Sequence, residues 1–328
     1  MSGYSAGIAF AVPFALSCVL TWLLTTGPAR ALALDRPNTR SLHERPIPRT
    51  GGIAIVIALL AAWLAAAASP HRYIVIAVVL IAALSLVDDV RSLPVAVRLL
   101  AHLAAAAAVV AAVAPHLPLL LWIGALIAVA WMINLYNFMD GSDGLAGGMA
   151  LFGFLFYACA AWRAGDTSFA LVNGSIAAAA AGFLVFNFHP ARIFMGDSGS
   201  VPLGLLAAAL GMQGWAQEAW PAWFPVLVFS PFIVDASATL MRRAWRRERL
   251  WHAHREHYYQ RLVQLGWGHT RTALAEYAVM ALAGATAVYA LELGRDGQSV
   301  VLGAAALLYM FAMLAVDAAW RTSAGAAP

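Results

Sequence analysis

Apolar residues in this chain come in long blocks, and short polar segments separate the blocks. Apolar runs cover about 52–68, 73–87, 97–114, 169–188 and 300–316. A helix needs roughly 20 mostly apolar residues to cross a hydrocarbon core about 30 Å thick, and several of these runs approach that length. The pattern therefore predicts an all-α polytopic membrane protein.

We expect about eleven transmembrane helices in a single membrane domain that covers residues 1–328. The expected spans are approximately 4–26, 52–68, 73–88, 98–114, 117–135, 147–162, 168–187, 200–214, 221–240, 271–292 and 299–319. Alternate connections then fall on opposite sides of the membrane. One side receives the polar segments 27–51, 89–97, 136–146, 188–199 and 241–270 together with the C-terminal tail, and the other side receives only short links.

Composition and charge support this class and orient the chain. Of 328 residues, 62% are hydrophobic and 11% charged, against roughly 25% charged in an average soluble domain. The net charge of +4 comes from arginine alone, and seventeen of the twenty arginines lie on the side of the long segments. Such a bias places these segments in the cytoplasm, with the N-terminus outside and the C-terminus inside. It indicates a membrane topology, not a nucleic-acid partner.

The first polar cluster is the pair Asp88 and Asp89, followed by Arg91, at the cytoplasmic end of the third expected span. Two adjacent carboxylates at a membrane boundary repel each other and are costly to bury. They can reach water at the helix end, bind a metal, or act as a base whose pKa the neighbouring carboxylate sets.

The second cluster contains Asn134, Asn137, Asp140 and Asp143 beside Gly-rich turns. The first three recur every third residue, so on a continuing helix they share one face. Their side chains suit a nucleobase, a ribose or a metal. A calcium loop is rejected because its spacing and its bidentate glutamate are missing.

The third cluster runs from Asn187 to Ser200 and includes Phe194 and Asp197. Glycine and serine before an apolar helix are typical of an anion site, because unpaired backbone N–H groups point there. By its chemistry alone, Phe194 is equally suited to packing and to stacking on a base.

Two basic segments complete the inventory. The segment 35–52 carries four arginines that suit a diphosphate or a lipid phosphate, and we expect Arg45 and, beside the aspartate pair, Arg91 to bind substrate. The segment 242–257 contains arginines suited to anionic lipid heads and three histidines. Histidines without cysteine, beside so many arginines, make a poor zinc site, so contact with phosphate is favoured.

The three polar clusters supply five aspartates, which are hard oxygen ligands suited to Mg²⁺ or Mn²⁺. They also supply arginines for phosphate oxygens and glycine turns for close backbone approach. This is the inventory that phosphoryl transfer requires.

The motifs resemble those of the polyprenyl-phosphate N-acetylhexosamine-1-phosphate transferases, a group in glycosyltransferase family 4 that includes the lipid I synthase of peptidoglycan. The matching pieces are D-R-P-N-T-R-S-L-H-E-R-P-I-P-R-T-G-G, V-D-D-V-R-S-L-P, N-L-Y-N-F-M-D-G-S-D-G-L-A-G and N-F-H-P-A-R-I-F-M-G-D-S-G-S. They occur in family order over about 35–270, and H-A-H-R-E-H looks more like the O-antigen-initiating branch.

The resemblance implies a role for each matching residue. Asp88 and Asp89 match the paired aspartates near the lipid phosphate, and Asp197 matches a magnesium ligand, with Asp88 as our second expected ligand. The nucleotide pocket would include Asn137, Asp140, Asp143, Asn187 and Phe194, the last two contacting uracil. The family often shows adjacent histidines where this chain has separated ones, so His254 and His257 are both candidates for the phosphate contact.

The implied reaction joins UDP-N-acetylhexosamine and undecaprenyl phosphate, at the cytoplasmic face of a bacterial inner membrane, and releases UMP. A homodimer is suggested by the family alone. A transporter with a cytoplasm-facing acidic site is the alternative, since transporters also carry ionisable residues in broken helices. A membrane phosphatase is a further rival that would need no nucleotide pocket.

Overall fold

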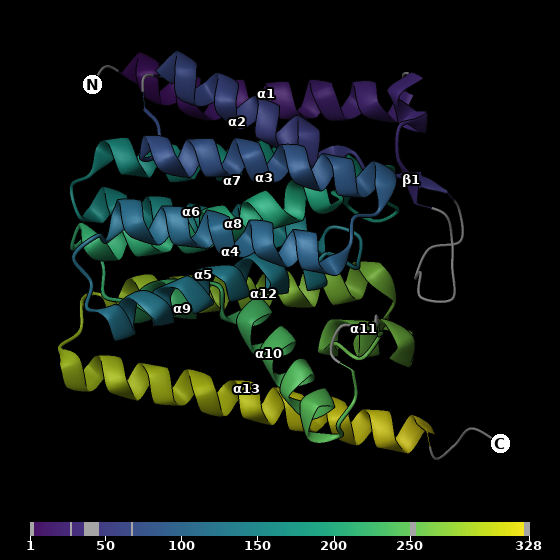
Figure 1. Ribbon diagram of the computed structural model, residues 1–328. Helices are drawn as coiled ribbons and strands as arrows, with labels where there is room; N and C mark the ends of the chain where they lie inside the picture. The colour runs from purple at the N-terminus through teal and green to yellow at the C-terminus, as the bar shows by residue number, and fades with distance from the viewer. Residues whose placement is uncertain (1–2, 27, 36–45, 67, 250–253, 325–328) are drawn as a thin grey trace.

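The computed structural model describes residues 3–26, 28–35, 46–66, 68–249 and 254–324. The chain forms a bundle of helices that run side by side, with a two-stranded ribbon at one end (Figure 1). The elements are α1 (Gly3–Thr26), η1 (Pro28–Ala31), β1 (Leu34–Asp35), β2 (Ile47–Pro48), α2 (Gly51–Ala66), α3 (Arg72–Arg91), α4 (Val95–Val113), α5 (Leu119–Phe138), α6 (Leu145–Arg163), α7 (Thr167–Asn187), α8 (Asp197–Ala216), α9 (Trp223–Val228), α10 (Ser230–Trp245), α11 (Tyr258–Leu262), η2 (Val263–Trp267), α12 (Gly268–Ala290) and α13 (Arg295–Ala324). In the ribbon, β1 and β2 are antiparallel, with Leu34 opposite Pro48 and Asp35 opposite Ile47.

The polar connections gather at one end of the bundle, which we call the loop end. It holds β1, the turns that follow α3, α5 and α7, and α11 (Figure 1). Helix α1 begins and α13 ends at opposite ends of the bundle. The predicted separation of long polar segments from short links is therefore present in the fold.

Eight helical runs in the described part of the chain are long and apolar enough to cross a membrane, and α2 is a shorter apolar helix. They include α1, α3 to α7, α13 and the run from Tyr258 to Ala290 that ends with α12. The expected spans at 200–214 and 221–240 correspond to α8 and to α9 with α10, which do not meet the same criteria. The all-α membrane architecture is confirmed, and the count of eleven spans stays a prediction.

Small residues let the central helices approach closely. A Cβ added at Gly204 on α8 would lie 2.9 Å from backbone atoms of Met132 and Ile133 on α5. A Cβ at Gly182 on α7 would lie 2.4 Å from the carbonyl oxygen of Phe14 on α1. Close backbone approach at small residues is how membrane helices gain dispersion energy where water drives no burial.

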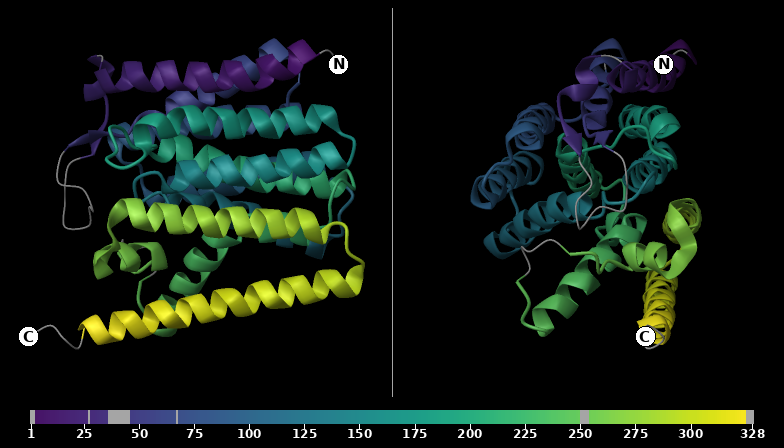
Figure 2. Two further views of the ribbon diagram at one scale, coloured as in Figure 1. Left: turned by 180° about the vertical axis from the view of Figure 1, so that it is seen from behind. Right: turned by 90° about the vertical axis from the view of Figure 1, so that its right-hand side faces the viewer.

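The segment expected to form one span at 221–240 is broken in two. Helix α9 ends at Val228, α10 begins at Ser230, and Pro231 lies in the first turn of α10. Proline has no N–H to donate to the preceding turn, so it interrupts a continuous helix at that point. Helix α10 then runs obliquely to its neighbours (Figure 1), whereas α13 lies at the edge of the bundle (Figure 2).

Candidate active site

Asp89, in the last turn of α3, fastens the start of α8. Its Oδ1 accepts the N–H of Asp197 at 3.1 Å, and its Oδ2 accepts the N–H of Ser198 at 2.9 Å. The side chain is 1% exposed. The first N–H groups of a helix have no partner within the helix and carry partial positive charge, so a carboxylate there is stabilised.

Asp88 and Asp197 share one guanidinium. Arg98 Nη1 on α4 lies 3.1 Å from Asp88 Oδ2 and 3.7 Å from Asp197 Oδ2. The other oxygen of Asp88 accepts the N–H of Leu93 at 2.5 Å. The two carboxyl groups are themselves within hydrogen-bonding reach of each other. Arg98 therefore draws the end of α3 and the start of α8 together.

The turn after α5 reaches the same place. Asn137 Nδ2 lies 2.9 Å from both Asp197 Oδ1 and Ser200 Oγ. The carboxyl group of Asp140 accepts a hydrogen bond from the N–H of Gly196. The second and third sequence clusters are thus joined by direct contacts, as their predicted shared role requires.

The resulting acidic cluster contains Asp88, Asp89, Asp140 and Asp197. Burial, together with the charges of Asp197 and Asp89, raises the pKa of Asp140 to about 8. Two guanidinium groups lie against the cluster: Arg98 and Arg49, whose Nε is 3.8 Å from Asp89 Oδ1. With all four carboxyl groups ionised, the described residues of the cluster would carry two negative charges more than these guanidiniums neutralise. Crowded, half-buried oxygen donors with surplus negative charge fit a hard divalent cation such as Mg²⁺.

At Gly196 the backbone lies so close to the acidic cluster that no side chain would fit. Its φ is +71°, and an added Cβ would lie 2.2 Å from the carbonyl oxygen of Arg49 and 2.9 Å from Asp89 Oδ2. Any side chain would be strained by this φ and would also displace the acid beside it. The glycine signal in the third motif therefore has a specific structural cause.

Asp143 lies in the same loop as Asp140 but is turned to other partners. Its Oδ2 is 2.6 Å from His189 Nδ1 and 3.1 Å from the N–H of Ala191. The His189 ring stacks on that of His269 at 5.2 Å with an interplanar angle of 11°, and His269 contacts Ser142. One ligand atom from each of Asp143, His189 and His269 lies within 4.8 Å of the others. Imidazole lone pairs lie in the ring plane, so parallel rings do not converge on one ion. We interpret these three residues as a structural contact that joins the turns after α5 and α7 to the start of α12.

Asn187 is buried and also links two loops. Its Oδ1 accepts the N–H of Gly144 at 3.1 Å, and its Nδ2 donates to the carbonyl oxygen of Ile193 at 2.9 Å. Phe194 is half-buried, and its backbone joins the segment after β2: its N–H donates to Pro48 at 2.7 Å and its carbonyl accepts from Gly51 at 3.0 Å. The predicted contacts of Asn187 and Phe194 with uracil stay predictions.

The two arginines predicted to bind substrate are placed differently. Arg91 is exposed in the last turn of α3, beside the acidic cluster in sequence. Arg45 lies outside the described residues. Their contacts with substrate stay predictions as well.

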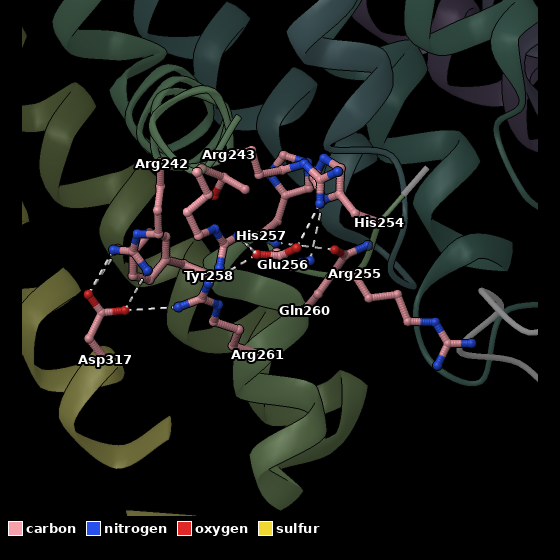
Figure 3. A network of polar contacts seen from close by, with 12 residues as sticks. Arg242, Arg243, His254, Arg255, Glu256, His257, Tyr258, Gln260, Arg261 and Asp317 are labelled. Atoms are coloured by element: carbon pink, nitrogen blue, oxygen red, sulfur yellow. Dashed lines mark hydrogen bonds and ion pairs between the residues drawn. The ribbon is translucent and has the colours of Figure 1, made fainter. Parts of the chain in front are cut away.

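The histidine segment, residues 254–259, lies beside the arginines of α10 (Figure 3), and the buried carboxylate of Asp235 holds it there. Asp235 accepts the N–H groups of Tyr258 at 2.9 Å and Tyr259 at 3.1 Å, and its Oδ1 is 3.2 Å from His257 Nδ1. A carboxylate only accepts, so Nδ1 carries the proton and His257 Nε2 remains for another partner. Burial, with the charges of His257 and Arg243, lowers the pKa of His254 to about 4, so this imidazole is neutral at pH 7.

Tyr259 connects this segment to the acidic cluster. Its hydroxyl approaches the carbonyl oxygen of Phe138 at 3.4 Å, and an added Cβ at Gly141 would lie 2.2 Å from that hydroxyl. Helix α11 therefore abuts the turn that carries Asp140. The segments that meet around the acidic cluster therefore extend from Arg49, before α2, to α11.

Some residues at this site were missed in the sequence. Arg98 and Asp235 were absorbed into expected spans, and so was His102, which contacts Asn134 at 3.2 Å. The available signal was the presence of ionisable residues inside apolar segments, which is costly unless they are paired or functional. Arg98 and His102 are four residues apart, on one face of α4.

Comparisons with known proteins show which families and relatives the chain is similar to. Residues 71–214, which include all four aspartates of the acidic cluster, match the model of glycosyl transferase family 4. The chain is 28% identical over 290 residues to a probable undecaprenyl-phosphate N-acetylglucosaminyl 1-phosphate transferase of Bacillus subtilis, covering 83% of this chain and 81% of that protein. It is 27% identical over 344 residues to a decaprenyl-phosphate N-acetylglucosaminephosphotransferase of Mycobacterium tuberculosis, covering 88% and 85%. A shorter match, 35% identical over 165 residues, covers 49% of this chain and 50% of a phospho-N-acetylmuramoyl-pentapeptide-transferase of Moorella thermoacetica.

Proposed function

The chain belongs to the polyprenyl-phosphate hexosamine-1-phosphate transferase family, and on this premise we propose that it transfers N-acetylhexosamine-1-phosphate from a UDP-sugar to undecaprenyl phosphate. The product would be an undecaprenyl-diphospho-sugar, the first lipid-linked sugar of a cell-surface glycan such as O-antigen. The proposed setting is the cytoplasmic face of a bacterial inner membrane.

The observation that carries this proposal is the acidic cluster at the loop end. Three helix ends and two glycine turns bring Asp88, Asp89, Asp140 and Asp197 together with a surplus of negative charge. Asp88 and Asp197 would hold Mg²⁺ or Mn²⁺. When bound, the cation would neutralise the diphosphate of the donor and the charge that develops on the leaving UMP.

An apolar groove is a second observation in favour of a long prenyl acceptor. It has a volume of about 330 Å³ and is lined by α5, α6, α8, α9 and α10, including Trp131, Met132, Trp215 and Ile233. Leu135, at one end of the lining on α5, is two residues from Asn137 of the acidic cluster. A chain lying in this groove would bring its phosphate head toward the loop end.

The chemistry we propose is a direct displacement. An oxygen of the lipid phosphate forms a bond to the sugar-proximal phosphorus of the donor. The bond from that phosphorus to the bridging oxygen breaks, and UMP leaves with the electron pair. Arg98 and Arg49 offer guanidinium donors to phosphate oxygens at the cluster. The neutral His254 would contact the diphosphate through its ring N–H, and His257 is the second candidate for this contact.

The transporter alternative has less support. Transporter sites lie near the bilayer midplane between structural repeats. The helix ends and turns that carry these carboxylates lie instead at one end of the bundle (Figure 1). A water-using phosphatase would have no use for the nucleotide contacts that we propose.

The test is UMP release by the purified protein in detergent, with undecaprenyl phosphate, Mg²⁺ and a panel of UDP-N-acetyl sugars. We expect release that requires the lipid, the metal and Asp197, so that Asp197→Asn is inactive. Asp296→Asn removes an exposed carboxylate at the other end of the bundle and should retain full activity.

The sugar with the highest rate would name the donor. Release of phosphate from the lipid without any UDP-sugar would establish the phosphatase. Sugar uptake by proteoliposomes without UMP release would establish the transporter.

A further inference from the structure

A second charged site lies between α10, α11 and α13, away from the acidic cluster. It is a pocket of about 490 Å³ lined by Arg242, Arg246, Arg261, Arg321, Glu256 and Asp317, with Trp320 beside them. Figure 3 shows Arg242 of α10 and Arg261 of α11 turned toward Asp317 of α13. Nothing in the proposed reaction uses this pocket.

Both acids of the pocket are already neutralised within the protein. Asp317 accepts a two-pronged contact from Arg242 at 2.8 and 2.7 Å, and a further contact from Arg261 at 2.9 Å. Glu256 is paired with Arg246 and with Arg243. Arg243 does not line the pocket, and its Nη1 lies 2.6 Å from Glu256 Oε1. Neither carboxylate needs a cation from outside.

The lining instead has positive charge to spare. With the adjoining Arg243 and Glu248 included, five arginines and three carboxylates among the described residues leave two positive charges. Arg321 is exposed and makes no ion pair with any residue in the described part of the chain. The Arg261 side chain is 6% exposed and its Nε has no hydrogen-bond partner there. Unmatched guanidinium donors at a half-buried site attract an anion.

The walls of the pocket continue into an apolar, outward-facing surface. No residue in the most apolar window of α13 is buried, and Leu307, Leu308, Phe311 and Leu314 are more than half exposed. At the end of α10, Trp245 is 88% exposed. Exposed leucines next to tryptophan and arginine are typical of the boundary between acyl chains and head groups.

We propose that this pocket binds the phosphodiester head group of an anionic phospholipid, whose acyl chains lie along α13. A phosphodiester offers two terminal oxygens and one negative charge, which match paired guanidinium donors. A zwitterionic head group would bring an ammonium group among arginines, and a free phosphate would gain nothing from the apolar wall. The proposal does not depend on the reaction catalysed at the acidic cluster.

The test counts lipids bound to the intact, delipidated protein by native mass spectrometry. The probes are dioleoyl phosphatidylglycerol, dioleoyl phosphatidylcholine and inorganic phosphate. We expect phosphatidylglycerol to bind at least about fivefold more tightly than phosphatidylcholine, because one basic residue contributes about a fivefold factor near an anionic lipid. Inorganic phosphate at millimolar concentration should not displace it.

Arg321→Gln is the decisive variant, because Arg321 has no ion pair whose loss would disturb the fold. We expect it to weaken phosphatidylglycerol binding about fivefold, whereas Arg321→Lys, which keeps the charge, should stay within about twofold. The matched control is Arg247→Gln: Arg247 is exposed at the loop end and does not line the pocket.

Equal loss in Arg247→Gln and Arg321→Gln would overturn the proposal in favour of general attraction to a basic surface. Equal binding of the two lipids, unchanged binding in Arg321→Gln, or full displacement by inorganic phosphate would also overturn it.

Discussion

The acidic cluster and the arginine pocket are both half-buried networks of charged side chains near the same end of the bundle, yet they are left with opposite charge. In the acidic cluster, four carboxylates face two guanidiniums. In the pocket, four guanidiniums face two carboxylates. The first network therefore carries surplus negative charge, and the second carries surplus positive charge.

The carboxyl groups report this difference through their pKa values. Burial and the neighbouring carboxylates together raise the pKa of Asp140 to about 8. Burial also favours a higher pKa at Glu256, but the hydrogen bond and charge of Arg246 and the charge of Arg243 outweigh it, so the pKa is lowered. The net charge of such a network thus indicates whether it attracts a cation or an anion.

The largest expected effect comes from Asp89, which carries charge and also fastens α8. In Asp89→Asn, one amide oxygen must serve two backbone N–H groups, and the amide hydrogens oppose them. We expect UMP release to fall by about 10²–10³-fold, the usual effect of disturbing a preorganised charge site.

The control is Asp166→Asn at the other end of the bundle. Asp166 Oδ1 accepts the N–H of Phe169 at 2.9 Å at the start of α7, so it has the same kind of bond. Asparagine caps a helix about as well as aspartate, and its rate should stay within about twofold. Equal losses in both variants would mean that helix capping, not the acidic cluster, determines activity.

The next effect is the pH dependence of metal binding. The raised pKa of about 8 means that Asp140 is protonated at pH 6 and half ionised at pH 8. A divalent cation binds the ionised form and releases the proton, so affinity should rise about 50-fold over this interval. Calorimetry of Mn²⁺ binding to nucleotide-free protein, in two buffers of different ionisation enthalpy, measures both affinity and proton release.

Asp140→Asn should bind the metal more weakly and lose most of this dependence on pH. A wild-type affinity that does not change between pH 6 and 8 would show that no carboxyl group near the metal is protonated there. The comparison between the two networks would then rest on their contacts alone.

The smallest effect is on stability, and it concerns the arginine pocket. Asp317→Asn leaves Arg242 and the buried Arg261 without their shared carboxylate. Loss of charged hydrogen bonds at a partly exposed site should lower the free energy of unfolding by about 2 kcal/mol. The apparent melting temperature in detergent, followed by tryptophan fluorescence, should fall by several degrees.

Asp296→Asn is the matched variant, with an exposed aspartate in the first turn of the same helix. It should change the free energy of unfolding by about 0.5 kcal/mol or less. Similar shifts in both variants would argue that Asp317 contributes only through surface charge, and the pocket would lose its structural role.

Much of this protein was predictable because membrane burial requires long apolar runs and phosphate chemistry requires short polar motifs, and both can be recognised within one segment. Long apolar blocks predicted the all-α membrane fold, and four motifs predicted the family, which the comparisons confirm. The convergence of Asp88, Asn137, Asp140 and Asp197 could be expected from shared chemistry, and the contacts among them agree with it. Their roles as ligands or catalytic groups stay predictions.

Other features were not predictable, because they depend on which helices are neighbours. Nothing local pairs Arg98 with Asp88 and Asp197, or Asp235 with the histidine segment. The turning of Asp143 toward His189, away from Asp140, likewise follows from the placement of the turns after α5 and α7.

From the sequence alone one can predict that the chain spans a membrane, which end carries the polar chemistry, and which residue types meet there. These follow from composition and from hydrophobic length, which act on each segment separately. The packing of the helices determines which charged side chains pair with one another. That depends on distances of a few ångströms between helices far apart in the chain, and electrostatic energy in a poorly solvated interior changes steeply over such distances.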